Sequence, residues 1–537
     1  MKYKKFVKSI AQLCLSVCFS AVFLLLFLTP AFAAPGDLDT GFGSGGTVLT
    51  EFDQYIFGQI VLVQPDSKII VAGSITYPGT PANTYFVVLR YNSNGSLDAT
   101  FGNQGKVFTS ILGSDVVKAG ALQGDGKIVI GGESGDGFSV VRYNADGSLD
   151  STFGSSGKIT TSLPSTPVVQ MHALLIQPDG KIVTVGDNQG TAIYLLRYNA
   201  DGTADTSFGS GGKVISRIFP LGNYAATAAL QTDGKILVGG AAYNDATGLD
   251  SAIFRYNTDG TLDNTFDNDG AAVYPVSNRT DSIRKLLIRP DGKILSVGRA
   301  AHNTQLLIYY TIGVFNANGA PDTSFGSNGF SLTPQAGNTA IEDALLQPDG
   351  KIVVGGTKIS AFDGRWRFHI ARFNANGTFD LTFGNGGKVS LPVGYDSSGL
   401  AVAIQPDNKL LLAGFGTYPS RRKQQIAVNR FQGGNGPIPT SAMITGQVSD
   451  DFSLRGVGGV QVVLTSSALS APLTTRTNPF GFYRFPNLPV NVQYNLSIET
   501  KKRATFKTSL SNILLNGDEY VEDMVFRYSG SNTPILQ

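Results

Sequence analysis

The apolar positions of this chain fall into short runs rather than long periodic segments. In one representative stretch, runs rich in Val, Ile, Phe and Tyr occupy positions 107–110, 116–122, 127–131 and 138–143. The residues between the runs include Pro-Asp-Gly and Asn-x-Asp-Gly, which suit tight turns because Pro fixes one dihedral angle and Gly accepts the left-handed region. No segment shows a convincing helical period. The pattern therefore predicts an all-β protein made of short strands.

Three motifs recur seven times in fixed order. They are Leu-Asp-x-Thr-Phe-Gly, with its Phe at 42, 101, 153, 208, 266, 325 and 383; Gln-Pro-Asp-Gly-Lys, with its Lys at 68, 127, 181, 235, 293, 351 and 409; and Arg-Tyr-Asn, beginning at 90, 142, 197, 255, 314, 372 and 430. Val314 is the one departure from Arg at the start of the third motif. Four short strands in repeats of 52 to 59 residues predict the blades of a seven-bladed β-propeller.

Closure of the ring hides sheet edges that a linear array would expose. If the ring closes, residues 37–42 supply the segment that would otherwise follow the seventh Arg, at position 430. The repeats closely resemble the bacterial delta-60 repeat family over Leu38–Phe431. That resemblance implies a secreted or surface-located propeller-like domain and implies no particular activity. We assign residues 34–432 to the propeller and 433–440 to a Gly- and Pro-rich linker.

Residues 441–537 alternate apolar and polar positions in a strand-like way. The best motif is the run Thr477-x-x-x-Gly481-x-Tyr483-x-Phe485. Over Ser441–Tyr528 the segment resembles the carboxypeptidase regulatory-like domain, although Pro479-Phe480 replaces the commoner polar pair before the Gly. The resemblance implies a small transthyretin-like β-sandwich with an accessory, non-catalytic role.

The N-terminal segment has the features of a secretory signal peptide. Four lysines precede an apolar stretch that ends in Ala31-Phe32-Ala33, which predicts cleavage after Ala33 and a signal peptide at 1–33. A retained N-terminal anchor is the alternative, since the apolar run approaches membrane-spanning length. Cleavage would leave no stable membrane anchor and place the protein outside the cell, in the periplasm or at the cell surface. It would also remove both cysteines, Cys14 and Cys18, and with them any disulfide or thiol chemistry.

The charge balance gives no reason to expect a nucleic-acid partner. The chain has 42 Lys+Arg and 40 Asp+Glu, and loss of the four signal-peptide lysines would give a net charge of −2. We find no Gly-x-Ser-x-Gly or His-Glu-x-x-His motif, and the three histidines occupy unrelated repeat positions. No catalytic residue or cofactor is therefore assigned.

The repeated turn Asn144-x-Asp146-Gly147-x-x-Asp150 allows two interpretations. Asn and Asp at such positions cap backbone amides in ordinary turns, which we favour; oxygen ligands at alternate positions also suit Ca²⁺. We interpret the repeat lysine that follows Asp-Gly as a solvated hairpin charge.

Almost all variation in repeat length lies between the repeat lysine and the next Arg-Tyr-Asn motif, where the spacing ranges from 15 to 22 residues. Because successive strands run up and down, the loops between the third and fourth apolar runs share one face, and the Asp-Gly turns share the opposite, uniform face. Loops on a rigid scaffold often carry recognition. The candidate ligand-binding residues on the variable face are Tyr77, Tyr85, Tyr243, Arg365, Trp366, Tyr418, Arg421 and Arg422.

These observations predict a non-enzymatic binding or scaffold protein. Its partner would be a polysaccharide or an extracellular or envelope protein, recognised through the propeller loops. The alternative is a propeller hydrolase or lyase that acts on extracellular polysaccharide, since the fold supports such enzymes. Two unmatched carboxylates at the mouth of the central channel would favour the enzyme.

Overall fold

The computed structural model describes residues 33–434 and 441–536, apart from short gaps at 78, 80–82, 136, 164–168, 245–246, 278, 303–306, 335–338, 361–362, 419–422, 451–459, 467–468, 470, 478–481, 490–491, 500–507, 516–518, 522–523 and 530–532. The predicted signal peptide, except Ala33, and most of the predicted linker lie outside the described residues. Within the described part of the chain, no helix has the length and apolar character needed to cross a membrane.

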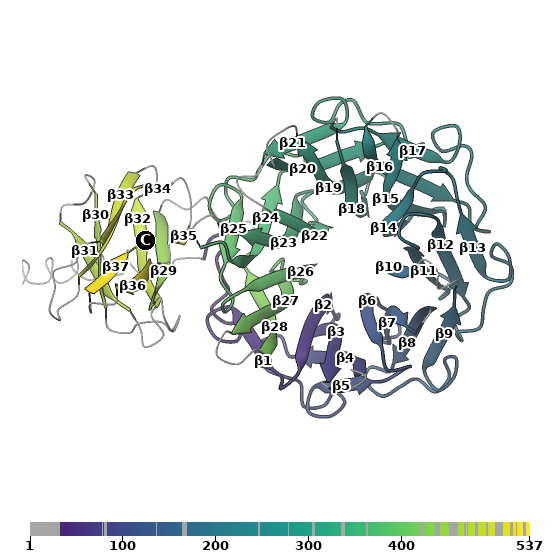
Figure 1. Cartoon of the computed structure of the whole chain (residues 1–537), viewed down its shortest axis with the longest axis horizontal. Coiled ribbons are helices and arrows are strands. Elements are labelled where there is room, and N and C mark those ends of the chain that lie inside the picture. Colours follow the sequence, from purple (N-terminus) through teal and green to yellow (C-terminus); the bar gives the residue numbers. More distant parts are fainter. Residues whose placement is uncertain are drawn as a thin grey trace, which may run out of the picture.

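Seven four-stranded antiparallel sheets are arranged around a common axis, as Figure 1 shows. Written from the innermost to the outermost strand, blade 1 comprises β2 (Tyr55–Val63), β3 (Ile69–Tyr77), β4 (Asn83–Tyr91) and β5 (Lys106–Thr109); blade 2 comprises β6 (Asp115–Leu122), β7 (Ile128–Ser134), β8 (Gly137–Tyr143) and β9 (Lys158–Ser162); and blade 3 comprises β10 (Gln170–Ile176), β11 (Ile182–Asp187), β12 (Ile193–Tyr198) and β13 (Lys213–Ser216).

The other four blades repeat this order. Blade 4 comprises β14 (Asn223–Leu230), β15 (Ile236–Asn244), β16 (Gly248–Tyr256) and β17 (Ala271–Tyr274); blade 5 comprises β18 (Asp281–Ile288), β19 (Ile294–His302), β20 (Leu307–Phe315) and β21 (Phe330–Pro334); blade 6 comprises β22 (Thr339–Leu346), β23 (Ile352–Ile359), β24 (Trp366–Phe373) and β25 (Lys388–Leu391); and blade 7 comprises β26 (Ser397–Ile404), β27 (Leu410–Tyr418), β28 (Lys423–Phe431) and β1 (Thr47–Glu51). The prediction of a seven-bladed all-β propeller is confirmed.

The ring closes by joining the two ends of the repeat region. Strand β1 pairs with β28 as the outermost strand of blade 7, with Thr47 opposite Asn429. Ahead of it, Leu38 forms a bridge with Phe431, and the amide of Asp39 donates to the carbonyl of Arg430 at 2.8 Å. Residues 37–42 therefore take the place predicted from the sequence.

The phase of the strands, which the sequence left open, is now defined. The apolar run at 107–110 belongs to β5 and completes blade 1, whereas the next three runs begin blade 2. Each sequence repeat thus spans parts of two blades, and the chain passes from the outermost strand of one blade to the innermost strand of the next.

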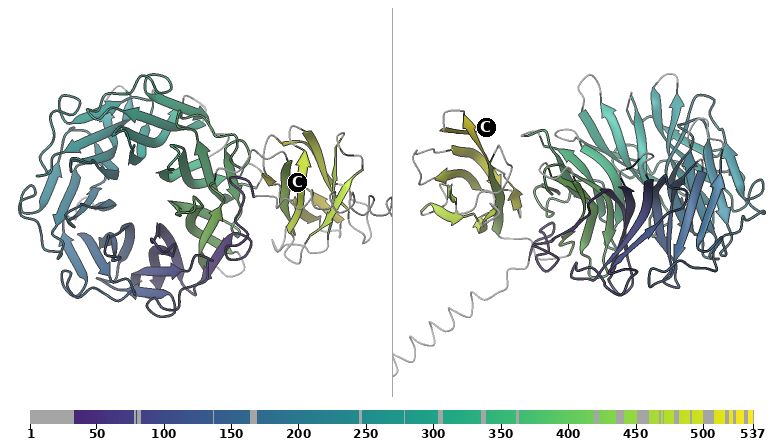
Figure 2. Two further views of the ribbon diagram at one scale, coloured as in Figure 1. Left: turned by 180° about the vertical axis from the view of Figure 1, so that it is seen from behind. Right: turned by 60° about the horizontal axis from the view of Figure 1, so that its bottom comes forward.

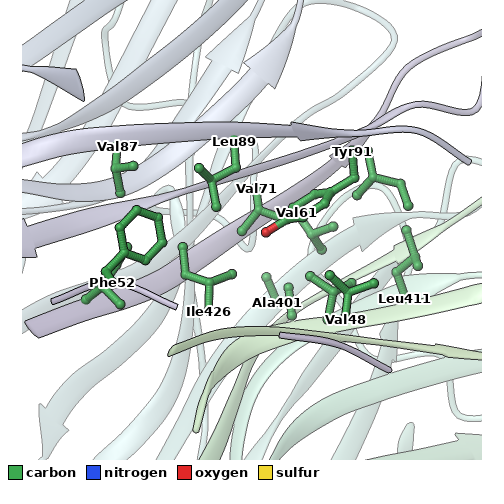
Figure 3. Packing of buried hydrophobic residues seen from close by; sticks show 14 of the residues in the cluster. Val48, Phe52, Val61, Val71, Val87, Leu89, Tyr91, Ala401, Leu411 and Ile426 are labelled. Carbon is green, nitrogen blue, oxygen red and sulfur yellow. The ribbon is translucent and has the colours of Figure 1, made fainter. Parts of the chain in front are cut away.

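Buried apolar side chains fill the space between neighbouring blades. Figure 3 shows the closing interface, where Val71 and Leu89 of blade 1 pack with Val48, Leu411 and Ile426 of blade 7. The repeat phenylalanines are also buried; Phe101, for example, has no exposed surface. Gly147 of the following blade has φ +89°, and a Cβ there would lie 2.9 Å from the Phe101 ring, which accounts for glycine at this turn position.

The C-terminal part forms two further sheets, described by themselves. One has the order β32-β29-β36-β37 with β35 beside β29, and the other has the order β31-β30-β33-β34. Their bounds are β29 (Ser441–Asp450), β30 (Gln461–Thr465), β31 (Leu473–Arg476), β32 (Phe482–Pro489), β33 (Val492–Glu499), β34 (Thr508–Leu515), β35 (Glu519–Val521), β36 (Met524–Ser529) and β37 (Thr533–Leu536).

Candidate binding site at the propeller axis

The innermost strand of every blade contains a β-bulge at the same place. The register with the second strand shifts between Gly58 and Ile60 in blade 1 and between Val117 and Ala119 in blade 2, and the other five blades repeat this. A bulge inserts one residue that has no partner on the neighbouring strand and can redirect its side chain. Bulges are therefore a common way to aim side chains at a site.

The seven inserted residues form a set that we call the bulge ring. Its members are Gln59, Lys118, His172, Ala226, Arg284, Glu342 and Leu400. Although they belong to the strands nearest the axis, visible at the centre of the ring in both Figure 1 and Figure 2, all seven are partly or fully exposed, whereas the residue before each is buried. Seven different side chains thus face solvent from one structural position.

A second ring lies on the adjacent strands. It consists of Ser74, Glu133, Asp187, Ala241, Arg299, Thr357 and Phe415, one from each blade. In blades 1 to 3 these side chains connect to the next blade: the oxygens of Ser74, Glu133 and Asp187 accept the backbone N–H of Val117, Met171 and Ala225 at 2.8, 3.0 and 3.0 Å. Part of the second ring therefore holds the bulges in place.

Several charges of the two rings are matched. Lys118 Nζ lies 3.5 Å from Glu133, and His172 Nε2 lies 3.2 Å from Asp187. Between blades 5 and 6, Lys285 Nζ lies 2.7 Å from Asp343, whose other oxygen accepts the backbone N–H of Val402 at 3.0 Å. Each of these acids thus accepts a backbone donor, and Glu133 and Asp343 are also paired with a lysine.

Arg284, Arg299 and Glu342 form a less balanced group. Burial lowers the pKa of Arg299, and the like charge of Arg284 lowers it further. The negative charge of Glu342 raises this pKa and so opposes both effects. Partial desolvation by the surrounding protein raises the pKa of Glu342, and the positive charges of Arg284 and Arg299 lower it. One side of the Glu342 side chain remains exposed to solvent. Two guanidinium groups thus act electrostatically on one carboxylate, and no direct ion pair joins these three described residues.

The opposite face of the propeller carries a repeated arrangement that we call the Arg–Asp–Lys clamp. In blade 2, Arg142 Nε and Lys127 Nζ lie 2.7 and 3.0 Å from the same oxygen of Asp150, whose other oxygen accepts from the amide and hydroxyl of Thr152. Arg142 also donates to the carbonyl of Ala200 in the next blade. Because the lysine and the aspartate come from different turns, both sets of Asp-Gly turns lie on one face, as predicted.

The clamp recurs as Arg90–Asp98–Lys68, Arg197–Asp205–Lys181, Arg255–Asp263–Lys235, Arg372–Asp380–Lys351 and Arg430–Asp39–Lys409. Burial alone would raise the pKa of Asp150, but hydrogen bonds from Thr152 and Lys127, together with Arg142, hold it well below its ordinary value. The interpretation of the repeat lysine as a solvated hairpin charge is wrong, because that lysine pairs with a buried aspartate in the clamp.

The residues proposed as weak calcium ligands have protein partners. Asp146 accepts from the amide and hydroxyl of Ser148 at 2.9 and 2.7 Å, and the Asn144 amide donates to the Ser148 hydroxyl. Asp150 belongs to the clamp. No cluster of three or more potential metal-ligating His, Cys, Asp or Glu residues occurs among the described residues. Turn chemistry and the clamp account for these contacts.

The predicted loop residues are spread over four blades. The Tyr77 and Tyr85 rings of blade 1 lie in contact at a tilt of 50°, with centroids 5.4 Å apart, and Tyr243 in blade 4 is 41% exposed. In blade 6, Trp366 is 50% exposed, and the neighbouring Arg365 lies 4.1 Å above the Tyr395 ring.

Tyr418 lies at the end of β27, but its side chain, like Arg421 and Arg422, falls outside the described residues. The structure therefore brings together Tyr77 with Tyr85, but it does not gather the described loop candidates into one cluster.

The two rings were missed by the sequence reasoning, yet a signal was present. Every bulge residue lies nine positions before a repeat lysine, and every second-ring residue lies six positions after it. At these two positions the residue type differs from repeat to repeat, whereas the motifs around them stay constant. A position of fixed spacing and changing chemistry is the pattern expected of a binding site on a repeated scaffold.

Comparison with known proteins supports the repeat assignment. The family model described as "Domain of unknown function (DUF5122) beta-propeller" matches residues 64–101, 123–153, 177–208, 231–266 and 347–383. Each matched segment runs from the lysine turn to the repeat phenylalanine. A comparison with curated proteins finds no match.

Solved structures give distant likenesses. A protein of unknown function from Dyadobacter fermentans is 12% identical with a TM-score of 0.39, covering 72% of this chain and 98% of its own. The β-propeller domain of the Trilobed protease from Pyrococcus furiosus is 10% identical with a TM-score of 0.38, covering 72% and 97%. Likenesses at this level carry no information on function. The chain therefore contains a seven-bladed β-propeller, and five of its repeat segments match the DUF5122 beta-propeller model, in agreement with the delta-60-like repeats.

Proposed function

We propose that the protein is an extracytoplasmic, non-enzymatic binding or scaffold protein that recognises a polysaccharide or an envelope protein at the axial mouth of its propeller. The observation that carries this proposal is the bulge ring, whose seven side chains differ in every blade at constant spacing. Positions with a structural role keep the same residue type from repeat to repeat, as the Arg, Asp and Lys positions of the clamp do in six blades. An asymmetric set of exposed side chains on a symmetric scaffold is suited to recognition of one particular ligand.

The position of the ring along the axis connects it with the loop candidates. The bulge residue is the third to fifth residue of its strand, and the strand ends at the lysine turn on the uniform face. The ring therefore lies near the middle of the innermost strands, midway in blade 1 and slightly towards the variable face in the other six blades. The loops that carry Trp366 and Tyr243 would then surround the mouth of the channel, with the bulge ring at its base. We propose that both side chains contribute to binding.

The engaged acids support binding over hydrolysis. A glycosidase needs two carboxyl groups that are free to act as acid and as base or nucleophile. Glu133, Asp187 and Asp343 each accept a backbone N–H from the next blade. Glu133 and Asp343 also lie beside a lysine, and Asp187 lies beside the His172 ring. A hydrolase or lyase that acts on extracellular polysaccharide is accordingly the less favoured candidate.

Two parts of the proposal rest on sequence. Residues 1–33 would direct export as a signal peptide, which places the propeller outside the cytoplasm. The C-terminal sheets would form the carboxypeptidase regulatory-like accessory domain that the Thr477–Phe485 motif resembles, and would contribute spacing or attachment rather than catalysis.

A symmetrised ring tests the proposal. In the mature chain, Lys118→Gln, His172→Gln, Arg284→Gln and Glu342→Gln would place at four bulges the residue that blade 1 already holds there, Gln59. Wild type and variant would be compared on a glycan array and against purified envelope proteins. We expect the variant to keep its melting temperature within a few degrees and to lose the ligands that the wild type binds. Full retention of those ligands would place recognition elsewhere.

A further inference from the structure

We propose that Arg284 and Arg299 form a carboxylate-binding subsite that recognises acidic sugar residues at the mouth of the propeller. The inference rests on the proposed function and names the chemical class of the ligand.

The two arginines come from neighbouring strands of blade 5. Arg284 is the bulge residue of β18, and Arg299 lies on β19 opposite Ser282, two residues before the bulge residue. Both arginines are partly exposed, and Glu342, the bulge residue of blade 6, is exposed beside them. Strand β22, which carries Glu342, packs against β18 and β19, which carry the two arginines, and the electrostatic effect of each charge on the others agrees with this placement.

Neither arginine has a partner that would explain its presence. Among the residues that the structure describes, no side-chain hydrogen bond or ion pair reaches either guanidinium group, and the buried Nε of Arg284 has no acceptor. A guanidinium group offers five N–H donors, and a buried donor without an acceptor is unfavourable. The free protein therefore has donors at this position that a ligand would satisfy.

A structural role does not account for Arg299. Ser74, Glu133 and Asp187, at the same position in blades 1 to 3, each accept an amide N–H from the next blade. A guanidinium group has no acceptor and cannot replace them. Arg299 thus occupies a blade-joining position without the chemistry that joins blades.

The local charge favours an anion. Lys285 is paired with Asp343, which leaves Arg284 and Arg299 against the single carboxylate of Glu342. The planar donors of two arginines fit the two oxygens of a carboxylate. Glu342 beside them is an acceptor for neighbouring hydroxyl groups. A ligand that carries one carboxylate and several hydroxyls satisfies the whole group, and a uronic acid is such a ligand.

The test is a calorimetric titration of the full mature chain with trigalacturonate at low ionic strength. Maltotriose serves as the neutral comparison and inorganic phosphate as the free anion. Arg284→Gln and Arg299→Thr carry residues found at the same positions in blades 1 and 6, so they suit the fold. Arg289→Gln is the matched control, because it removes an arginine of the same blade from the lysine turn on the uniform face, where the other six repeats carry Gln.

We expect wild type and Arg289→Gln to bind trigalacturonate with similar affinity and at least tenfold more tightly than maltotriose. Each arginine variant is expected to lose at least tenfold, whereas Glu342→Gln keeps or increases the affinity because a repelling charge is gone. Absence of trigalacturonate binding at millimolar concentration, or unchanged binding by both arginine variants, would overturn the inference. Phosphate binding as tight as trigalacturonate binding would also overturn it, because the sugar would then contribute nothing.

This outcome can be told apart from failure of the proposed function. If the symmetrised ring loses its array ligands but neither arginine variant affects trigalacturonate, the ring binds something other than an acidic sugar. If the symmetrised ring keeps all ligands, the proposed function itself fails.

Discussion

Removal of the Asp150 carboxylate probes what holds the blades together. Asp150 is almost fully buried, and Asp150→Ala would leave Arg142, 5% exposed, without its counter-ion. Breaking one side of a buried ion pair costs about 3–5 kcal/mol. We expect the lower end, about 3 kcal/mol, because Arg142 keeps its bond to the Ala200 carbonyl and its place 4.4 Å above the Phe153 ring. For a propeller of about 400 residues, this loss corresponds to a fall of about 4 °C in melting temperature.

Blade 5 supplies a matched control for this substitution. There Val314 replaces the clamp arginine, while Asp322 keeps Lys293 at 2.6 Å and its turn contacts to Ser324. Asp322→Ala should therefore lower the melting temperature by less than half as much as Asp150→Ala. Differential scanning calorimetry or circular dichroism on both variants measures the difference. Equal losses would refute the reasoning, because they would show that the arginine contributes nothing and that the turn contacts carry the whole effect.

Three further predictions concern pH, closure and metal. Hydrogen bonds from Lys293 and Ser324 lower the pKa of Asp322 to about 2, and the clamp carboxylates are likewise lowered, so their stabilisation is present above the unfolded pKa of about 3.9 and is lost as pH falls below it. The melting temperature should therefore drop steeply between about pH 5 and pH 2, and a flat profile would contradict this. Deletion of residues 34–51 from a chain that begins at Ala34 removes β1 and exposes the edge of β28, so light scattering should show aggregation that the undeleted chain lacks. A chelator should leave the melting temperature unchanged, whereas a rise of several degrees with millimolar Ca²⁺ would restore the calcium interpretation of the Asp146 turns.

The fold was accessible from the sequence because its determinants repeat. Three motifs at constant spacing identify seven units, and the segment at residues 37–42 matches the piece missing after Arg430, so closure could be predicted. The phase was not accessible, because the run at 107–110 follows the repeat phenylalanine Phe101 but pairs with β4, which precedes that phenylalanine in the chain. Strand pairing across a repeat boundary leaves no mark in the sequence of one repeat.

The candidate site was less accessible, for a physical reason. A β-bulge is a property of two paired strands, so Lys118 or Arg284 looks like an ordinary strand residue when its strand is read alone. A residue that changes in every repeat also looks like tolerated variation. The aromatic residues of the loops could be recognised in the sequence because Trp366 and its neighbours lie where the repeat spacing varies. Their role in binding stays a prediction.

The most direct measurement of the central claim compares two variants against one ligand. For any ligand that the wild-type chain binds, its affinity would be measured for the symmetrised ring and for Trp366→Ala, with unfolding curves for both. The account predicts at least a tenfold loss for the symmetrised ring at nearly unchanged stability, and a smaller loss for Trp366→Ala, which would remove one exposed contact from a loop. Wild-type affinity in the symmetrised ring would contradict the account and show that the axial residues do not take part in recognition.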